Sequence, residues 1–147
     1  MTITTDIKYI GVDDLDLDLF ESQYIVPNGI SYNSYLIEDE KLTVMDTVDL
    51  RKSDDWWRNL EEALNGRTPS YLVVQHMEPD HAGNIADLMA KYPEIKLVAS
   101  AKAIQMMPQF FEDTCFEGKT IAVKEGETLS LGAHTLQFFM APMVHWP

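Results

Sequence analysis

Two histidines and two carboxylates lie within six consecutive residues of this chain, from His76 to His81. The segment reads His-Met-Glu-Pro-Asp-His and directly follows the apolar run 71–74. Imidazole and carboxylate groups suit iron, zinc or manganese, and the lack of thiolate argues against an iron–sulfur cluster or a structural zinc site. Four such groups in six residues are too many for an ordinary polar loop, so the segment predicts a site for one metal ion or for two ions side by side.

The spacing of these residues indicates how the chain presents them. His76 and Glu78 are two residues apart and therefore point the same way in an extended segment. Pro79 cannot donate a hydrogen bond to a sheet, and after His81 the apolar residues recur as on one face of a helix. We therefore expect the ligands on a strand-to-helix loop at the carboxyl end of a buried strand, where open α/β sheets usually place their sites.

The surrounding pattern of strands and helices predicts a layered α/β architecture. Strands are expected at residues 8–12, 22–26, 32–37, 41–46, 71–75, 96–99, 120–124, 128–131 and 135–140. Helices are expected at residues 53–64, from the ligand loop to about 92, and from about 101 towards 111, the last being disturbed by Pro108. Ser53 is expected to cap the first helix. The alternating run from Asp14 to Leu19 predicts an extended edge with one wet face.

Composition restricts the class of protein and its surroundings. With 147 residues, 46% of them hydrophobic, the chain can form one domain with a real core. A net charge of −13 argues against binding to nucleic acid or to an anionic membrane, and no apolar run is long enough to span a bilayer. Cys115 is the only cysteine and no signal segment precedes the domain, so we expect a cytoplasmic protein without internal disulfides.

The motif His76-x-Glu78-x-Asp80-His81 resembles the diiron motif of the flavodiiron proteins, or A-type flavoproteins, which have a metallo-β-lactamase-like fold. Hydrolases of that fold carry His-x-His-x-Asp-His, so Glu78 stands where they have a histidine. A carboxylate is an anionic and harder donor, which favours iron that changes its oxidation state. The resemblance extends to residues 29–37 and 46–49 and to the closing segment 141–147, and it spans essentially the whole sequence.

This resemblance implies an α/β fold, the metallo-β-lactamase-like αβ/βα sandwich. Residues 1–147 would be its first half, a sheet with flanking helices. It also implies a first iron held by His76, Glu78 and His145 and a second iron near Asp80 and His81. The remaining ligands and a flavodoxin-like FMN domain come later in the family's chains. We therefore expect a truncated diiron domain that does not itself bind FMN. A complete domain would hold two irons, whereas this chain would hold one tightly, with zinc as a competitor.

The function implied by the resemblance is that of an oxidoreductase. Such a protein reduces dioxygen to water or nitric oxide to nitrous oxide, with electrons from a donor such as rubredoxin or a reduced flavin. The alternatives are a hydrolase of the same fold, against which Glu78 weighs, and a catalytically inactive metal-binding half-domain. A half-sandwich would expose an apolar sheet face, so we also expect a homo-oligomer.

Three further positions attract a functional interpretation. Asp46 ends a strand that faces the expected site, and it either supports the ligand loop through hydrogen bonds or simply caps a turn. His134 precedes the final strand without another ligand near it in sequence, and we expect it to be a turn or surface residue. Trp56 and Trp57 lie at helical core spacing, which is more typical of packing than of flavin stacking.

Overall fold

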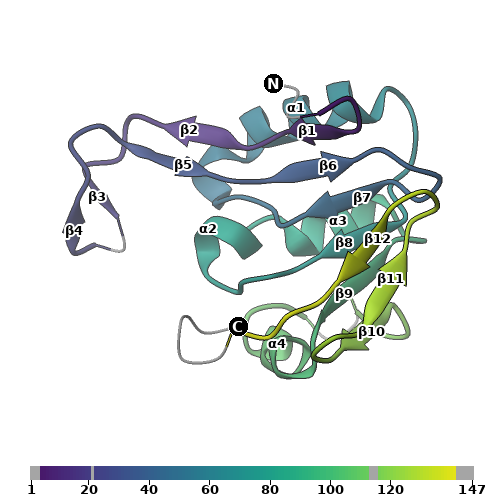
Figure 1. Ribbon diagram of the computed structural model, residues 1–147. Coiled ribbons are helices and arrows are strands. Elements are labelled where there is room, and N and C mark those ends of the chain that lie inside the picture. The colour runs from purple at the N-terminus through teal and green to yellow at the C-terminus, as the bar shows by residue number, and fades with distance from the viewer. Residues whose placement is uncertain (1–3, 21, 113–115, 142–147) are drawn as a thin grey trace.

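The computed structural model describes residues 4–20, 22–112 and 116–141, which form a six-stranded sheet with helices packed against it (Figure 1). The order of the strands is β1-β6-β7-β8-β9-β10. Their bounds are β1 Ile7–Tyr9, β6 Tyr35–Ile37, β7 Thr43–Met45, β8 Tyr71–Val73, β9 Lys96–Ser100 and β10 Thr120–Val123. Strands β7 to β10 are parallel, whereas β6 runs antiparallel to both of its neighbours. The expected α/β class is therefore confirmed.

The central strands β7, β8 and β9 carry buried residues on both faces of the sheet. The helices are α1 Ser53–Leu64, α2 Pro79–Ala82, α3 Ile85–Lys91 and α4 Ala101–Met106, with short 3-10 turns η1 Leu50–Lys52 and η2 Met107–Gln109. The larger core packs α1 and α3 against one face, and Trp56 and Leu88 are fully buried in it. The opposite face carries Val73 and Val98, over which the hairpin of β11 (Thr128–Ser130) and β12 (Thr135–Gln137) packs its apolar side chains (Figure 1). Among the described residues, no helix has the length and apolar character needed to cross a bilayer.

Helix α1 has the bounds that the sequence predicts, 53–64, but it begins differently. Ser53 is not its cap, because the 3-10 turn η1 leads directly into the helix and the Ser53 hydroxyl donates to the carbonyl of Leu50. The Asp49 side chain instead accepts from the backbone of Arg51 at the start of η1. At the other end, Asn65 takes the left-handed conformation that commonly ends a helix.

The acidic run from Asp14 to Leu19 departs from the expected wet aspartate face at its first two residues. Asp14 is fully buried, whereas Leu15 is 73% exposed. Asp14 accepts from Nε of Arg51 at 3.1 Å and from the hydroxyl of Tyr32 at 3.2 Å. A buried carboxylate is tolerated when it is paired and hydrogen-bonded in this way, whereas Asp16 and Asp18 are exposed as expected.

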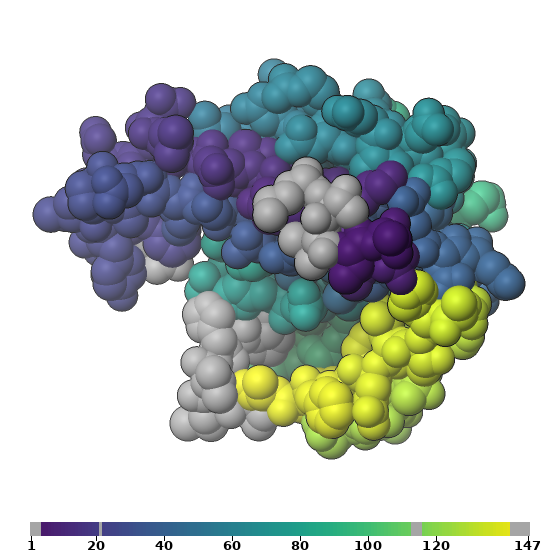
Figure 2. All heavy atoms as spheres, turned by 45° about the horizontal axis from the view of Figure 1, so that its top comes forward, coloured from purple at the N-terminus to yellow at the C-terminus, as the bar shows by residue number. Residues whose placement is uncertain are grey.

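Several of the expected strands are shorter or divided in two. The predicted strands 8–12 and 32–37 each contain two strands, because β2 (Val12–Asp14) and β5 (Ile30–Tyr32) pair with each other outside the main sheet. Strands β3 (Leu19–Phe20) and β4 (Tyr24–Ile25) form a small hairpin that projects from the body of the molecule (Figures 1 and 2). The predicted strand 22–26 is reduced to β4, and the predicted strand 135–140 is reduced to β12.

His134 lies in the turn between β11 and β12, as expected, and it holds that hairpin against two other parts of the chain. Its Nε2 atom lies 2.5 Å from a carboxylate oxygen of Asp6 and its Nδ1 atom lies 2.6 Å from one of Asp39. Figure 2 shows the hairpin, in yellow, beside the N-terminal segment, in purple. Hydrogen bonds with Asp39 and Asp6 raise the pKa of His134 above its ordinary value. The hydroxyl of Thr4 and then the ring of His134 lower the pKa of Asp6, and the backbone N–H of His134 is the main cause of the lowered pKa of Asp39.

We predict that exchanging His134 for glutamine lowers stability in a pH-dependent way. A raised histidine pKa contributes stability that is fully present below the ordinary value of 6.5 and is lost as pH rises through the folded-state value. The lowered carboxylate pKa values contribute above their ordinary value of 3.8 and are lost as pH falls through the folded-state values. Thermal melts of both proteins should therefore differ most between about pH 4 and 6.5 and converge at higher pH. A difference that stays constant from pH 5 to 9 would contradict this assignment.

Candidate metal centre

The four residues predicted as ligands come together beyond the carboxyl end of β8. His76 and Glu78 lie in the segment after this strand, as expected for a strand-to-helix loop. Asp80 and His81 do not lie in a loop, because they belong to the single helical turn α2. Pro79 explains this difference, since proline at the first helical position has no unsatisfied donor and its φ suits the helix.

The donor atoms of the four side chains form two close pairs. The Nε2 atom of His76 lies 3.0 Å from Oε2 of Glu78, and the Nε2 atom of His81 lies 3.5 Å from Oδ2 of Asp80. The two imidazole rings meet edge to face with their centroids 5.3 Å apart. Two ligands bound to one ion at about 2.1 Å and roughly at right angles lie about 3 Å apart. Each pair therefore has the spacing of two ligands on a shared metal ion.

Burial and a neighbouring carboxylate act on the pKa values of Asp80 and His81, respectively. Burial raises the pKa of Asp80, and the carboxylate of Asp46 raises the pKa of His81. Within the described part of the chain, Oδ1 of Asp80 is buried and has no hydrogen-bond partner. A buried carboxylate oxygen beside two imidazoles is well placed to receive a cation, because an unpaired buried acceptor is costly.

A complete metal cage is not present among these residues. The described residues contain no group of three imidazole, thiolate or carboxylate side chains already arranged around one point. His145, the third expected ligand of the first ion, lies outside the described residues, as does Cys115. The chemistry of the two pairs and the unpartnered oxygen of Asp80 nevertheless fit an ion such as iron or zinc.

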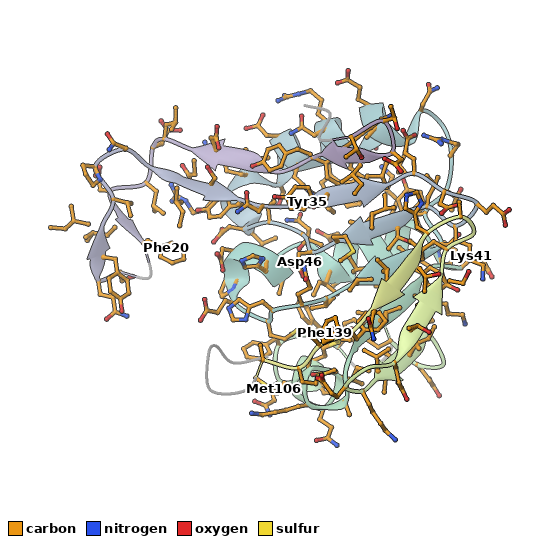
Figure 3. All side chains as sticks on the ribbon, viewed as in Figure 1. Phe20, Tyr35, Lys41, Asp46, Met106 and Phe139 are labelled. Carbon is orange, nitrogen blue, oxygen red and sulfur yellow. The ribbon has the colours of Figure 1, made fainter. Side chains whose placement is uncertain are left out.

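Asp46 lies just beyond the end of β7, beside α2 (Figure 3), in a left-handed backbone conformation with φ of 55°. One carboxylate oxygen accepts from the backbone N–H of Gln75 at 2.7 Å. The other accepts from the side chain of Gln75 at 3.2 Å and lies 3.3 Å from Nδ1 of His81. Asp46 thus contacts the residue before His76 and the ring of His81, which is more than the capping of a turn requires.

The sequence did not single out Thr47 and Asn84, whose hydrogen bonds hold the backbone around His81 in place. The N–H and the hydroxyl of Thr47 both donate to the carbonyl of His81, each at 2.8 Å. The N–H of Asn84 donates to the same hydroxyl, and the Asn84 side chain donates to the carbonyl of Val48. The only sequence signal for these contacts is that Thr47 belongs to the segment 46–49. Its partners are 34 and 37 residues away in the chain.

Comparison with known proteins gives one family model and a consistent set of relatives for this chain. Residues 30–147 match the sequence model of a family described as ODP family beta lactamase. The chain is 35% identical to a protein of Pectobacterium carotovorum named anaerobic nitric oxide reductase flavorubredoxin, over 99% of this chain and 29% of that protein. The match therefore spans less than a third of the relative's length.

Solved structures give the same result. A flavodiiron protein from Giardia intestinalis superposes with a TM-score of 0.90 at 28% identity, over 99% of this chain and 35% of that chain. The rubredoxin oxygen:oxidoreductase of Desulfovibrio gigas superposes with a TM-score of 0.88 at 32% identity, over 100% of this chain and 36% of that chain. The fold is therefore the metallo-β-lactamase-like fold of these proteins, of which the chain covers about a third.

Proposed function

Because this chain belongs to the flavodiiron protein family, through a beta-lactamase-like domain of the ODP type, we propose that it carries metal ligands of an oxygen or nitric oxide reductase. The relatives named above are oxidoreductases, one a nitric oxide reductase and one a rubredoxin oxygen:oxidoreductase. We propose that residues 1–147 form the first half of the metallo-β-lactamase-like sandwich.

The observation that carries this proposal is the pairing of the donor atoms after β8. We propose that His76 and Glu78 hold the first iron together with His145, and that Asp80 and His81 hold the second. The separations of 3.0 Å and 3.5 Å within the two pairs support this division. When bound, two iron ions would supply electrons and Lewis acidity to a small gas molecule.

The protein's own residues determine which ion this site favours. Glu78 provides an anionic oxygen donor at a position where the fold's hydrolases use a neutral imidazole, and an anionic ligand stabilises the more highly charged state of iron. Asp80 is buried and faces His81, so a cation would pair its unpartnered oxygen. Asp46 contacts the ring of His81 from the opposite side and supports its orientation.

The partners of the whole protein are also proposals. We propose that an FMN bound outside residues 1–147 passes electrons to the site, and that rubredoxin or a reduced flavin donates them, as the relatives' names suggest. A single cysteine fits a reducing cytoplasm. The β11–β12 hairpin covers the sheet face that we expected to be exposed. The proposed homo-oligomer is supported instead by exposed aromatic side chains such as Phe110, at 56%, and Phe139, at 70%.

The test is consumption of gas by the whole protein. Oxygen and nitric oxide electrodes should record turnover when reduced rubredoxin or another reduced donor is supplied. The wild type is compared with a variant in which asparagine replaces Asp80, an exchange that keeps the side chain's size and removes its charge. Turnover should fall at least tenfold in this variant. Hydrolysis of ester or thioester substrates, with no consumption of either gas, would instead favour the hydrolase of this fold.

A further inference from the structure

A chain of hydrogen bonds runs from the core of α1 to the backbone of His81. Nε1 of Trp56 donates to the hydroxyl of Ser34 at 3.1 Å, and this hydroxyl donates to the carbonyl of Asp46 at 2.8 Å. All three residues are nearly or completely buried. We propose that Trp56 and Ser34 are positioning residues for the metal centre, acting through the Asp46–Thr47 peptide to fix His81. This inference rests on the proposed function of the site.

The direction of these hydrogen bonds is fixed by chemistry. An indole N–H can only donate, so it must use a lone pair of the Ser34 hydroxyl. The single proton of that hydroxyl is then left for its other neighbour, the carbonyl of Asp46. Buried hydrogen bonds that share a group in this way polarise one another and strengthen the chain. Trp56 therefore orients the serine as well as filling the core.

The next step passes through one rigid peptide group. The carbonyl of Asp46 and the N–H of Thr47 belong to the same planar unit. Its oxygen accepts from Ser34, and its N–H donates to the carbonyl of His81 at 2.8 Å. Rotation of this plane would break both contacts, so the serine hydroxyl helps to set where the His81 backbone lies.

The same arrangement keeps Asp46 in its unusual conformation. A φ of 55° costs a residue with a side chain of the order of 1 kcal/mol or more, although aspartate tolerates it better than most. The N–H of Asp46 donates to Val73 and its carbonyl accepts from Ser34, so the peptide groups on both sides are held. From this conformation the carboxylate lies 3.3 Å from the ring of His81. Both the ring and the carbonyl of His81 are thus positioned through Asp46 and Thr47.

The experiment compares cobalt(II) binding by the whole protein and five variants. Cobalt(II) is titrated anaerobically against a competing chelator, and its visible absorption reports the coordination geometry. Trp56→Phe and Ser34→Ala should each weaken binding about tenfold or more and change the absorption band, since residues behind metal ligands typically contribute about 10- to 100-fold to affinity. Trp57→Phe is the matched control, because no hydrogen bond of the Trp57 indole occurs in the described structure, and it should bind as the wild type does.

The double variant, Ser34→Ala with Trp56→Phe, separates positioning from stability. Ser34→Ala alone leaves the indole N–H buried without an acceptor, which is destabilising. The double variant removes both partners, so thermal melts of the metal-free protein should show part of the lost stability recovered, while cobalt affinity stays low. Ser34→Thr keeps the hydroxyl and should retain most of the affinity.

Three results would overturn the inference. The first is wild-type affinity and an unchanged absorption band in Ser34→Ala and Trp56→Phe. The second is recovery of affinity in the double variant in step with its stability, which would show that the pair only stabilises the fold. The third is a wild-type protein that binds no cobalt, a result that would overturn the proposed function as well and so is distinguishable from the other two.

Discussion

Exchanging Glu78 for histidine should convert the site to the ligand pattern of the fold's hydrolases and shift its preference from iron to zinc. The change replaces an anionic oxygen donor, 3.0 Å from Nε2 of His76, by a neutral nitrogen donor. Zinc already exceeds ferrous iron in intrinsic affinity for such ligands. Gas reduction should fall by roughly a hundredfold or more, because a change in a direct metal ligand should cost more than the 10- to 100-fold that supporting contacts contribute.

Metal analysis and turnover of the whole protein would check this result. Glu62→His is a suitable control, since Glu62 lies on the exposed face of α1 and the exchange is chemically the same. The control should keep wild-type iron content and activity. The role given to Glu78 is wrong if the Glu78→His protein retains iron and reduces oxygen or nitric oxide at the wild-type rate.

Exchanging Gly83 for alanine should displace α2, which carries Asp80 and His81, and destabilise the protein by about 2–3 kcal/mol. Gly83 follows α2 with ordinary helical backbone angles, so the cost is purely steric. An added Cβ would lie 2.7 Å from the carbonyl oxygen of Val48 and 2.8 Å from the amide nitrogen of Leu50. These are backbone atoms of the loop that holds His81, and they cannot rotate away as a flexible side chain can.

Denaturant unfolding and metal binding together would measure this effect. Gly126→Ala is the matched control, because a Cβ there meets open space and only the positive φ of 76° is costly, at about 1 kcal/mol. Gly83→Ala should lose more stability than the control and should also bind metal more weakly. Equal losses in the two variants, with unchanged metal binding, would show that the close approach at Gly83 has no consequence for the site.

The fold was predictable where local pattern is strong. Helix α1 has the predicted bounds because its apolar residues recur over three turns and Asn65-Gly66 follows its end. The clustering of the four candidate ligands was predictable because they are adjacent in sequence and follow an apolar strand, a position typical of sites in α/β sheets. Strand bounds were less predictable, since most strands here have only two to four residues and offer little periodicity.

The features that the sequence did not predict depend on contacts between residues far apart in the chain. Asp14 is buried by an arginine 37 residues later, which no local alternation indicates. His134 meets aspartates 95 and 128 residues earlier, so the turn was foreseen but its contacts were not. The hydrogen bond from Trp56 to Ser34 spans 22 residues and depends on how α1 packs on the sheet. Such contacts follow from tertiary packing and leave no spacing to recognise.

We propose that the residues after β8 hold iron in a flavin-dependent reductase. The most direct measurement is the iron, zinc and FMN content of the whole protein, purified without oxygen, beside a variant in which His76 and His81 are both alanine. We predict two iron ions and one FMN per chain in the wild type, and FMN without iron in the variant. Zinc without flavin in the wild type, or iron content unchanged in the variant, would contradict the account.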